Sequence, residues 1–125
     1  MALSVQSDEE LLLVKEMMIL PVMIEVLERD IHIFANVKFK FPHLYAGSLR
    51  VIQDAVSGRL SEIRRQCRKR GIRVLGTERT REYIQAKYRA HGYEHSVTLL
   101  WELVRTAIEE RLASYLNVRL DNEKR

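Results

Sequence analysis

Residues 11–34 read LLLVKEMMILPVMIEVLERDIHIF, and this stretch decides the fold. Apolar residues recur in it at steps of three and four, which places them on one face of a helix; that stripe comprises Leu13, Met17, Leu20, Ile24, Leu27, Ile31 and Phe34. We expect the helix to cover residues 8–36, because Ser7 is a fitting N-cap and the acids that follow it complement the helix dipole. Pro21 predicts a kink near residues 17–21, or a break into two helices.

Two further helices are predicted downstream. The second covers about residues 43–70, with Gly71 as its capping glycine and an apolar stripe at Leu49, Ile52, Val56, Leu60, Ile63 and Cys67. The third covers about residues 93–117, with an apolar face at Val97, Leu100, Val104, Ile108, Leu112 and Tyr115. Residues 37–41 alternate apolar and basic, which is typical of a short extended segment.

Residues 72–90 allow two interpretations. Gly76-Thr77 is a turn signal, and Ile84, Ala86 and Tyr88 alternate with polar residues, which favours a β-hairpin with Gln85, Lys87 and Arg89 outward. A helix through Tyr83, Ile84, Lys87 and Tyr88 is the alternative. The expected fold is therefore mostly α (α+β), with three long helices and a small β-hairpin between the second and third. We expect one domain over residues 1–125.

Composition points to a globular protein of the cytoplasm. Of the 125 residues, 46% are hydrophobic and 30% charged, and there is one cysteine, so no intramolecular disulfide can form. The first ten residues carry acids where a signal peptide would carry Lys or Arg. The most apolar stretch, 11–27, is interrupted by Lys15, Glu16 and Glu25, so it is no membrane span. We expect no membrane partner and no cofactor.

Two stretches resemble a known family. Residues 19–31 read ILPVMIEVLERDI, and residues 91–95 read HGYEH and lead into LLW at 99–101. They are similar to the YhjD-type small uncharacterised proteins of Bacillus-like bacteria. The resemblance implies a bacterial cytoplasmic protein of unknown role, and it carries over no activity and no functional residue.

His91, Glu94 and His95 match the H-x-x-E-H pattern of inverted zinc proteases. Two histidines one helical turn apart could both reach a zinc ion, and the glutamate could activate its water. A third ligand is needed, and Gly92 falls where the helix should already be running. We therefore favour a strand-to-helix junction and place a metal-dependent hydrolase third among the possible functions.

Other reactive residues have simpler interpretations. Glu28, Asp30 and His32 lack the second Glu-x-x-His copy of a helical-bundle metal site; they fit a solvated helix face with Glu25, Arg29 and Asn36. Cys67 lies on an apolar stripe, where a buried, inert thiol is expected.

Positive charge gathers in one segment. Residues 64–89 carry ten Lys/Arg against two acids, whereas the whole chain has a net charge of +4. Cations complement the end of the second helix, but those beyond it need another explanation. Seven of these cations form a possible binding surface for nucleic acid or an acidic partner: Arg64, Arg65, Arg68, Lys69, Arg73, Lys87 and Arg89.

The leading functional hypothesis is a non-catalytic interaction or regulatory module that acts as a homo-oligomer. Sixteen of the 24 residues from Leu11 to Phe34 are apolar without Pro21, so more than one face of the first helix must be covered. We expect a homodimer with this helix at the interface. A nucleic-acid-binding protein is the alternative.

Overall fold

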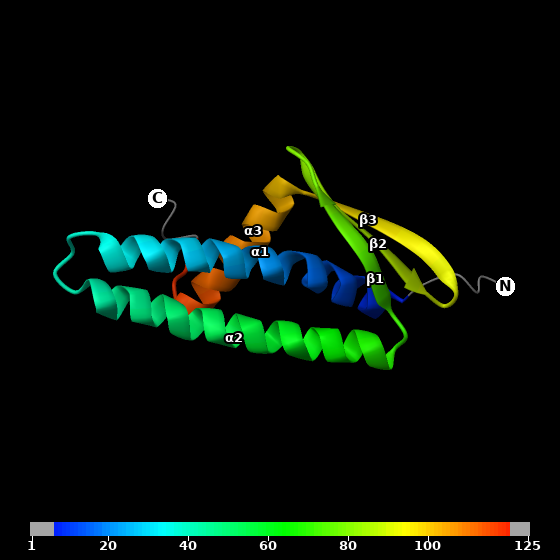
Figure 1. Ribbon diagram of the computed structural model, residues 1–125, viewed down its shortest axis with the longest axis horizontal. Coiled ribbons are helices and arrows are strands. Elements are labelled where there is room, and N and C mark those ends of the chain that lie inside the picture. The colour runs from blue at the N-terminus through cyan, green and yellow to red at the C-terminus, as the bar shows by residue number, and fades with distance from the viewer. Residues whose placement is uncertain (1–6, 121–125) are drawn as a thin grey trace.

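The computed structural model describes residues 7–120, which form three helices and one antiparallel sheet (Figure 1). The elements follow one another as α1 (Asp8–Asn36), α2 (Pro42–Lys69), β1 (Arg73–Arg79), β2 (Tyr83–Ala90), β3 (Tyr93–Leu100) and α3 (Trp101–Leu116). The strands lie in the order β1-β2-β3. The mostly helical fold is confirmed, but three strands stand where a two-stranded hairpin was predicted.

Helix α1 begins as its sequence predicts. The Ser7 side chain accepts from the backbone N–H of Glu10 at 3.1 Å, and the Glu10 carboxylate accepts from the Ser7 N–H at 3.3 Å. This reciprocal capping box satisfies two N–H groups that the first turn would leave unpaired. The helix then continues through Pro21 to Asn36, so the alternative of two separate helices is wrong.

Helix α2 runs antiparallel to α1 and is followed by a capping glycine, Gly71. Pro42 occupies its first turn, where a missing N–H costs nothing. At the other end Gly71 adopts a φ of +70°, and the Ile72 N–H donates to the Cys67 carbonyl at 2.9 Å. This pattern satisfies a terminal carbonyl and turns the chain into β1. The predicted cap is confirmed, and the helix ends one residue earlier than expected.

The predicted helix over residues 93–117 is wrong in its first third. His91 and Gly92 have φ values of +57° and +78°, the geometry of a two-residue hairpin turn. Residues 93–100 therefore fold back as β3, with Tyr93 opposite Ala90 and Leu99 opposite Ile84. Leu100, assigned to the apolar helical face, is 57% exposed, because in a strand it lies on the opposite face from Leu99.

Strand β3 passes into α3 without a linker. The Trp101 N–H donates to the Glu82 carbonyl at 3.1 Å, and the indole N–H of Trp101 donates to the Thr80 carbonyl at 2.7 Å. Both acceptors lie in the β1–β2 connection. The first residue of α3 is therefore fixed to the sheet through its backbone and its side chain.

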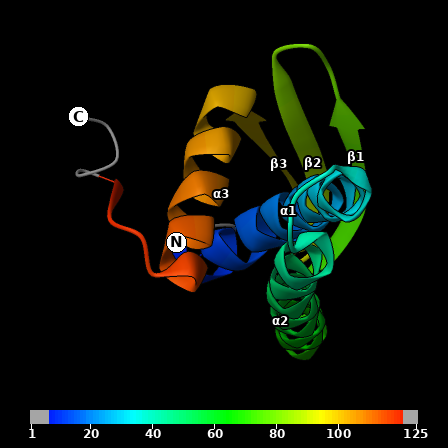
Figure 2. The ribbon, with the colours of Figure 1, turned by 90° about the vertical axis from the view of Figure 1, so that its left-hand side faces the viewer.

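Helix α1 is the central element of the fold. In Figure 2, where α1 and α2 are seen nearly end-on, α2, the sheet and α3 lie on different sides of α1. The side chains of Val14, Met23, Leu27, Ala86 and Tyr88 are fully buried. They belong to α1 and to the inner face of β2, and they join the buried side chains of α2 and α3 in one core around α1.

An ion pair joins the sheet edge to α1. The Arg79 guanidinium donates two hydrogen bonds to the two carboxylate oxygens of Glu25, each 2.8 Å long. These bonds hold the pKa of Glu25 below its usual value and raise that of Arg79.

Candidate functional site

A groove of about 740 Å³ separates α1 from α3, which crosses behind α1 in Figure 1. Its volume falls within the range of about 300–1,000 Å³ typical of ligand sites. Ten residues line it: Val22, Val26, Arg29, Asp30, Trp101, Val104, Arg105, Ile108, Glu109 and Leu112.

The groove has an apolar floor and charged banks. Val104 and Ile108 of α3 are buried in the floor, while Val26 of α1 remains 36% exposed. Arg29 and Asp30 line it from α1, and Arg105 and Glu109 line it from α3. An apolar surface with charges of both signs at its rim is typical of a protein contact.

The predicted basic residues of the sheet share one exposed face. Arg73 of β1 lies directly opposite Arg89 of β2, and Lys87 is two residues before Arg89 on the same strand. All three are exposed, while Tyr88 between them is buried. The predicted outward orientation of Lys87 and Arg89 is confirmed. The face is not purely basic, because Arg89 lies 3.5 Å from the Glu94 carboxylate.

The other predicted basic residues lie on the last turns of α2. Arg64, Arg65, Arg68 and Lys69 are exposed there, and the Arg65 guanidinium binds the Glu62 carboxylate at 2.8 Å. Of the ten cations in residues 64–89, four take part in ion pairs in the described part of the chain: Arg65, Arg70, Arg79 and Arg89. The positive charge of the segment is therefore partly neutralised.

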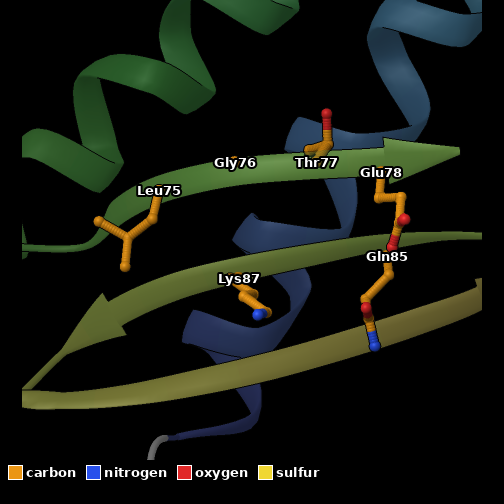
Figure 3. Close-up of a pocket in the computed structure, with 6 residues that line it drawn as sticks. All are labelled: Leu75, Gly76, Thr77, Glu78, Gln85 and Lys87. Atoms are coloured by element: carbon orange, nitrogen blue, oxygen red, sulfur yellow. The ribbon is translucent and has the colours of Figure 1, made fainter.

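A hollow of about 270 Å³ marks the outer face of the sheet (Figure 3). It arises at the irregularity between Val74 and Gly76, where the pairing of β1 with β2 shifts register. Gly76 has no side chain to fill the space, and the Lys87 ammonium and the Glu78 carboxylate border it. The hollow lies just below the size of common ligand sites, and we assign no ligand to it.

The H-x-x-E-H residues contact three different partners. His91 Nε2 lies 2.9 Å and 3.1 Å from the two carboxylate oxygens of Glu10. The His95 ring stacks on Tyr88 with centroids 5.2 Å apart, and Glu94 points to Arg89 on the opposite face. Within residues 7–120, no group of three or more His, Cys, Asp or Glu side chains is placed to hold a metal ion. The junction that we favoured is also wrong, because His91 and Gly92 form a hairpin turn.

Glu10 is the only charged residue buried among residues 7–120, at 7% exposure. The hydrogen bond from His91 is the main reason that the pKa of Glu10 lies below its usual value, with the Ser7 N–H adding to the effect. Burial opposes this shift. The carboxylate therefore joins the start of α1 to the β2–β3 turn.

Cys67 is 2% exposed on the apolar side of α2. Burial raises the pKa of its thiol, which keeps the thiol protonated and poorly nucleophilic at neutral pH.

The comparison with protein families gives a match along most of the chain. The model described as "YhjD protein" matches residues 5–120. The chain belongs to the YhjD family. No curated protein and no solved structure matches this YhjD chain.

One feature of this YhjD protein was missed by sequence reasoning. Val22 and Val26 lie off the predicted stripe of α1, and both line the groove against α3. Their apolar character was the available signal, but it did not indicate which element faces them.

No helix among the described residues has the length and apolar character needed to cross a bilayer.

Proposed function

We propose that this protein is a non-catalytic interaction or regulatory module of the bacterial cytoplasm that acts as a homodimer. The observation that carries the proposal is the groove between α1 and α3. It leaves Val26 of α1 exposed and Trp101 and Leu112 of α3 only partly buried in the single chain, and a partner would remove them from water.

A second copy of the chain fits the charges of the groove. In a two-fold dimer the same surface meets itself, so a patch of one sign would repel its copy. Here each bank carries one cation and one anion: Arg29 and Asp30 on α1, Arg105 and Glu109 on α3. Opposite charges can then pair across the two-fold axis around a shared apolar centre.

Light scattering coupled to size-exclusion chromatography tests the homodimer. We expect the purified protein at micromolar concentration to have twice the chain mass of 14.7 kDa. Val26→Glu should give monomers, because it buries a charge at the interface. Val51→Glu is the matched control, since Val51 is 70% exposed on α2 and outside the groove. A monomeric wild-type protein, or a Val51 variant that dissociates as readily, would contradict the proposal.

Nucleic-acid binding is the second candidate, and the Arg73–Arg89 pair favours it. Like charges directly opposite each other on neighbouring strands repel, and a phosphate bound between them would relieve that repulsion. Lys87 on the same face could contact a further phosphate. Three phosphate contacts would make the logarithm of the affinity fall by roughly 0.9 per phosphate for each tenfold rise in salt.

Titration of a labelled oligonucleotide tests nucleic-acid binding. It is carried out at about 50 mM salt, because phosphate contacts weaken as the salt concentration rises. Arg73→Glu should weaken binding, whereas Glu110→Lys on α3 should not. If the oligonucleotide does not bind, or if both variants change the affinity equally, the cations of the sheet are only a solvated face.

A further inference from the structure

The turn that joins α1 to α2 forms an exposed apolar tip. We use "hairpin tip" for residues 37–45, which lie at the end of the long axis opposite the sheet (Figure 1). Phe39 is 48% exposed, Phe41 57% and Leu44 68%. Side chains this large and apolar are costly to leave in water when they are contiguous. The groove and the hollow of the sheet both lie elsewhere.

Ring contacts hold part of the hairpin tip in place. Phe39 packs on Phe34 of α1 with ring centroids 5.4 Å apart, and on Tyr45 of α2 with centroids 5.7 Å apart. Phe41 directly precedes Pro42 in the first turn of α2, which restricts its backbone. The exposed rings are therefore presented by a structured turn.

Charge around the hairpin tip has one sign. Residues 31–53 contain no Asp and no Glu. Lys38, Lys40 and Arg50 lie in this stretch and are exposed. Lys38 and Lys40 alternate with Val37, Phe39 and Phe41, so each ammonium group is carried next to an apolar side chain.

We propose that the hairpin tip docks on the surface of a membrane that contains anionic lipids. A convex turn suits a bilayer surface, into which Phe and Leu side chains can enter at the headgroup level. The neighbouring lysines can extend their ammonium groups to the lipid phosphates. An acidic protein would need a concave apolar site for the same turn, and nothing about the tip requires one.

This contact is peripheral and independent of the proposed homodimer. The expectation of no membrane partner rested on the lack of a spanning segment, and none is found among the described helices. A protein that lies on the bilayer needs only an apolar surface with cations beside it. The surface that peripheral binding requires is therefore present, although none of the described helices could cross a bilayer.

Flotation with lipid vesicles tests the proposal. The full chain should float with vesicles of phosphatidylcholine and phosphatidylglycerol, and much less with phosphatidylcholine alone. Lys38→Glu/Lys40→Glu should lower the affinity by about fivefold or more per lysine. Phe39→Ser/Phe41→Ser should lower it by about tenfold or more, because the apolar area that enters the bilayer is lost.

Two double variants serve as matched controls, with circular dichroism to check folding. Arg64→Glu/Arg68→Glu makes the same change in net charge on the other end of α2. Leu100→Ser/Leu103→Ser removes two leucines that are 57% and 55% exposed where β3 passes into α3. Both controls should bind as the wild type does.

Three outcomes would overturn the proposal: no flotation with anionic vesicles, equal loss in the controls, or full binding by the tip variants. A tip that captures a poly-glutamate peptide and no vesicles would identify an acidic protein as the partner instead.

Discussion

Glu10→Gln should lower the free energy of unfolding by about 1–2 kcal/mol at neutral pH. The amide oxygen can still accept from the Ser7 N–H, so the capping box remains. The substitution removes the negative charge of Glu10. That charge faces His91 Nε2 at 2.9 Å and interacts favourably with the helix dipole. A hydrogen bond to a charged group contributes about 1 kcal/mol more than a neutral one, reduced here because the His91 side chain is 44% exposed. The dipole adds about 0.3–1 kcal/mol.

Thermal unfolding followed by circular dichroism measures this loss, which corresponds to about 4–8 °C in Tm for a domain of this size. The pKa of Glu10 is lower in the folded protein than the ordinary value of a glutamate side chain. Its charge therefore stabilises the fold above that value, and the contribution disappears as the pH falls through the folded-state pKa. The difference between variant and wild type should shrink accordingly in acid.

Glu9→Gln is the matched control. It removes the neighbouring charge of the same helical turn, whose side chain is 66% exposed and pairs with Arg70. Such an exposed pair contributes between about 0 and 1 kcal/mol. Equal losses in the two variants, or a Glu10→Gln deficit that persists undiminished in acid, would refute the assigned role of the His91 contact.

Four further substitutions test the fold by urea denaturation followed by circular dichroism. Gly92→Ala should cost about 1 kcal/mol or more, because φ is +78° there; Gly58→Ala inside α2, where an added Cβ meets nothing within 4 Å, should instead gain about 0.5–1 kcal/mol. Tyr88→Ala should cost about 3–5 kcal/mol, because the side chain is fully buried; a loss below 1 kcal/mol would contradict its place in the core. Trp101→Phe should lower the free energy of unfolding by about 1 kcal/mol, because it removes the N–H that donates to Thr80. An unchanged free energy would mean that this bond does not stabilise the junction between β3 and α3.

Sequence periodicity predicted the helices where one face is buried and the other solvated. The α2 residues Ile52, Val56, Leu60 and Ile63 are all buried as expected. On α1 the stripe was incomplete, because Val14, Met18 and Met23 are also buried. That helix is covered from several sides, so a single stripe understates its core.

Strand β3 was missed for a local physical reason. A hairpin turn of two residues with positive φ is usually signalled by Asn-Gly or Asp-Gly, and here His91 takes the first position. Without that signal, Val97, Leu100 and Val104 matched a helical spacing. The pairing of β3 with β2 depends on tertiary context, which here overrides the helical spacing.

The candidate surfaces were predictable to different degrees. Lys87 and Arg89 could be placed together from alternation along one strand. Their proximity to Arg73 depends on the register between strands, and the groove depends on where α3 packs. Neither is encoded in local spacing.

Because β3 passes directly into α3, we expect the sheet and this helix to move as one rigid unit. Leu100 ends the strand and Trp101 begins the helix, and the hydrogen bonds from Trp101 to Thr80 and Glu82 restrain the junction between them. A tilt of the sheet relative to α1 would then move α3 as well and change the width of the groove between α1 and α3. Glu10 with His91, and Glu25 with Arg79, hold the sheet to α1 and thereby set that width from a distance.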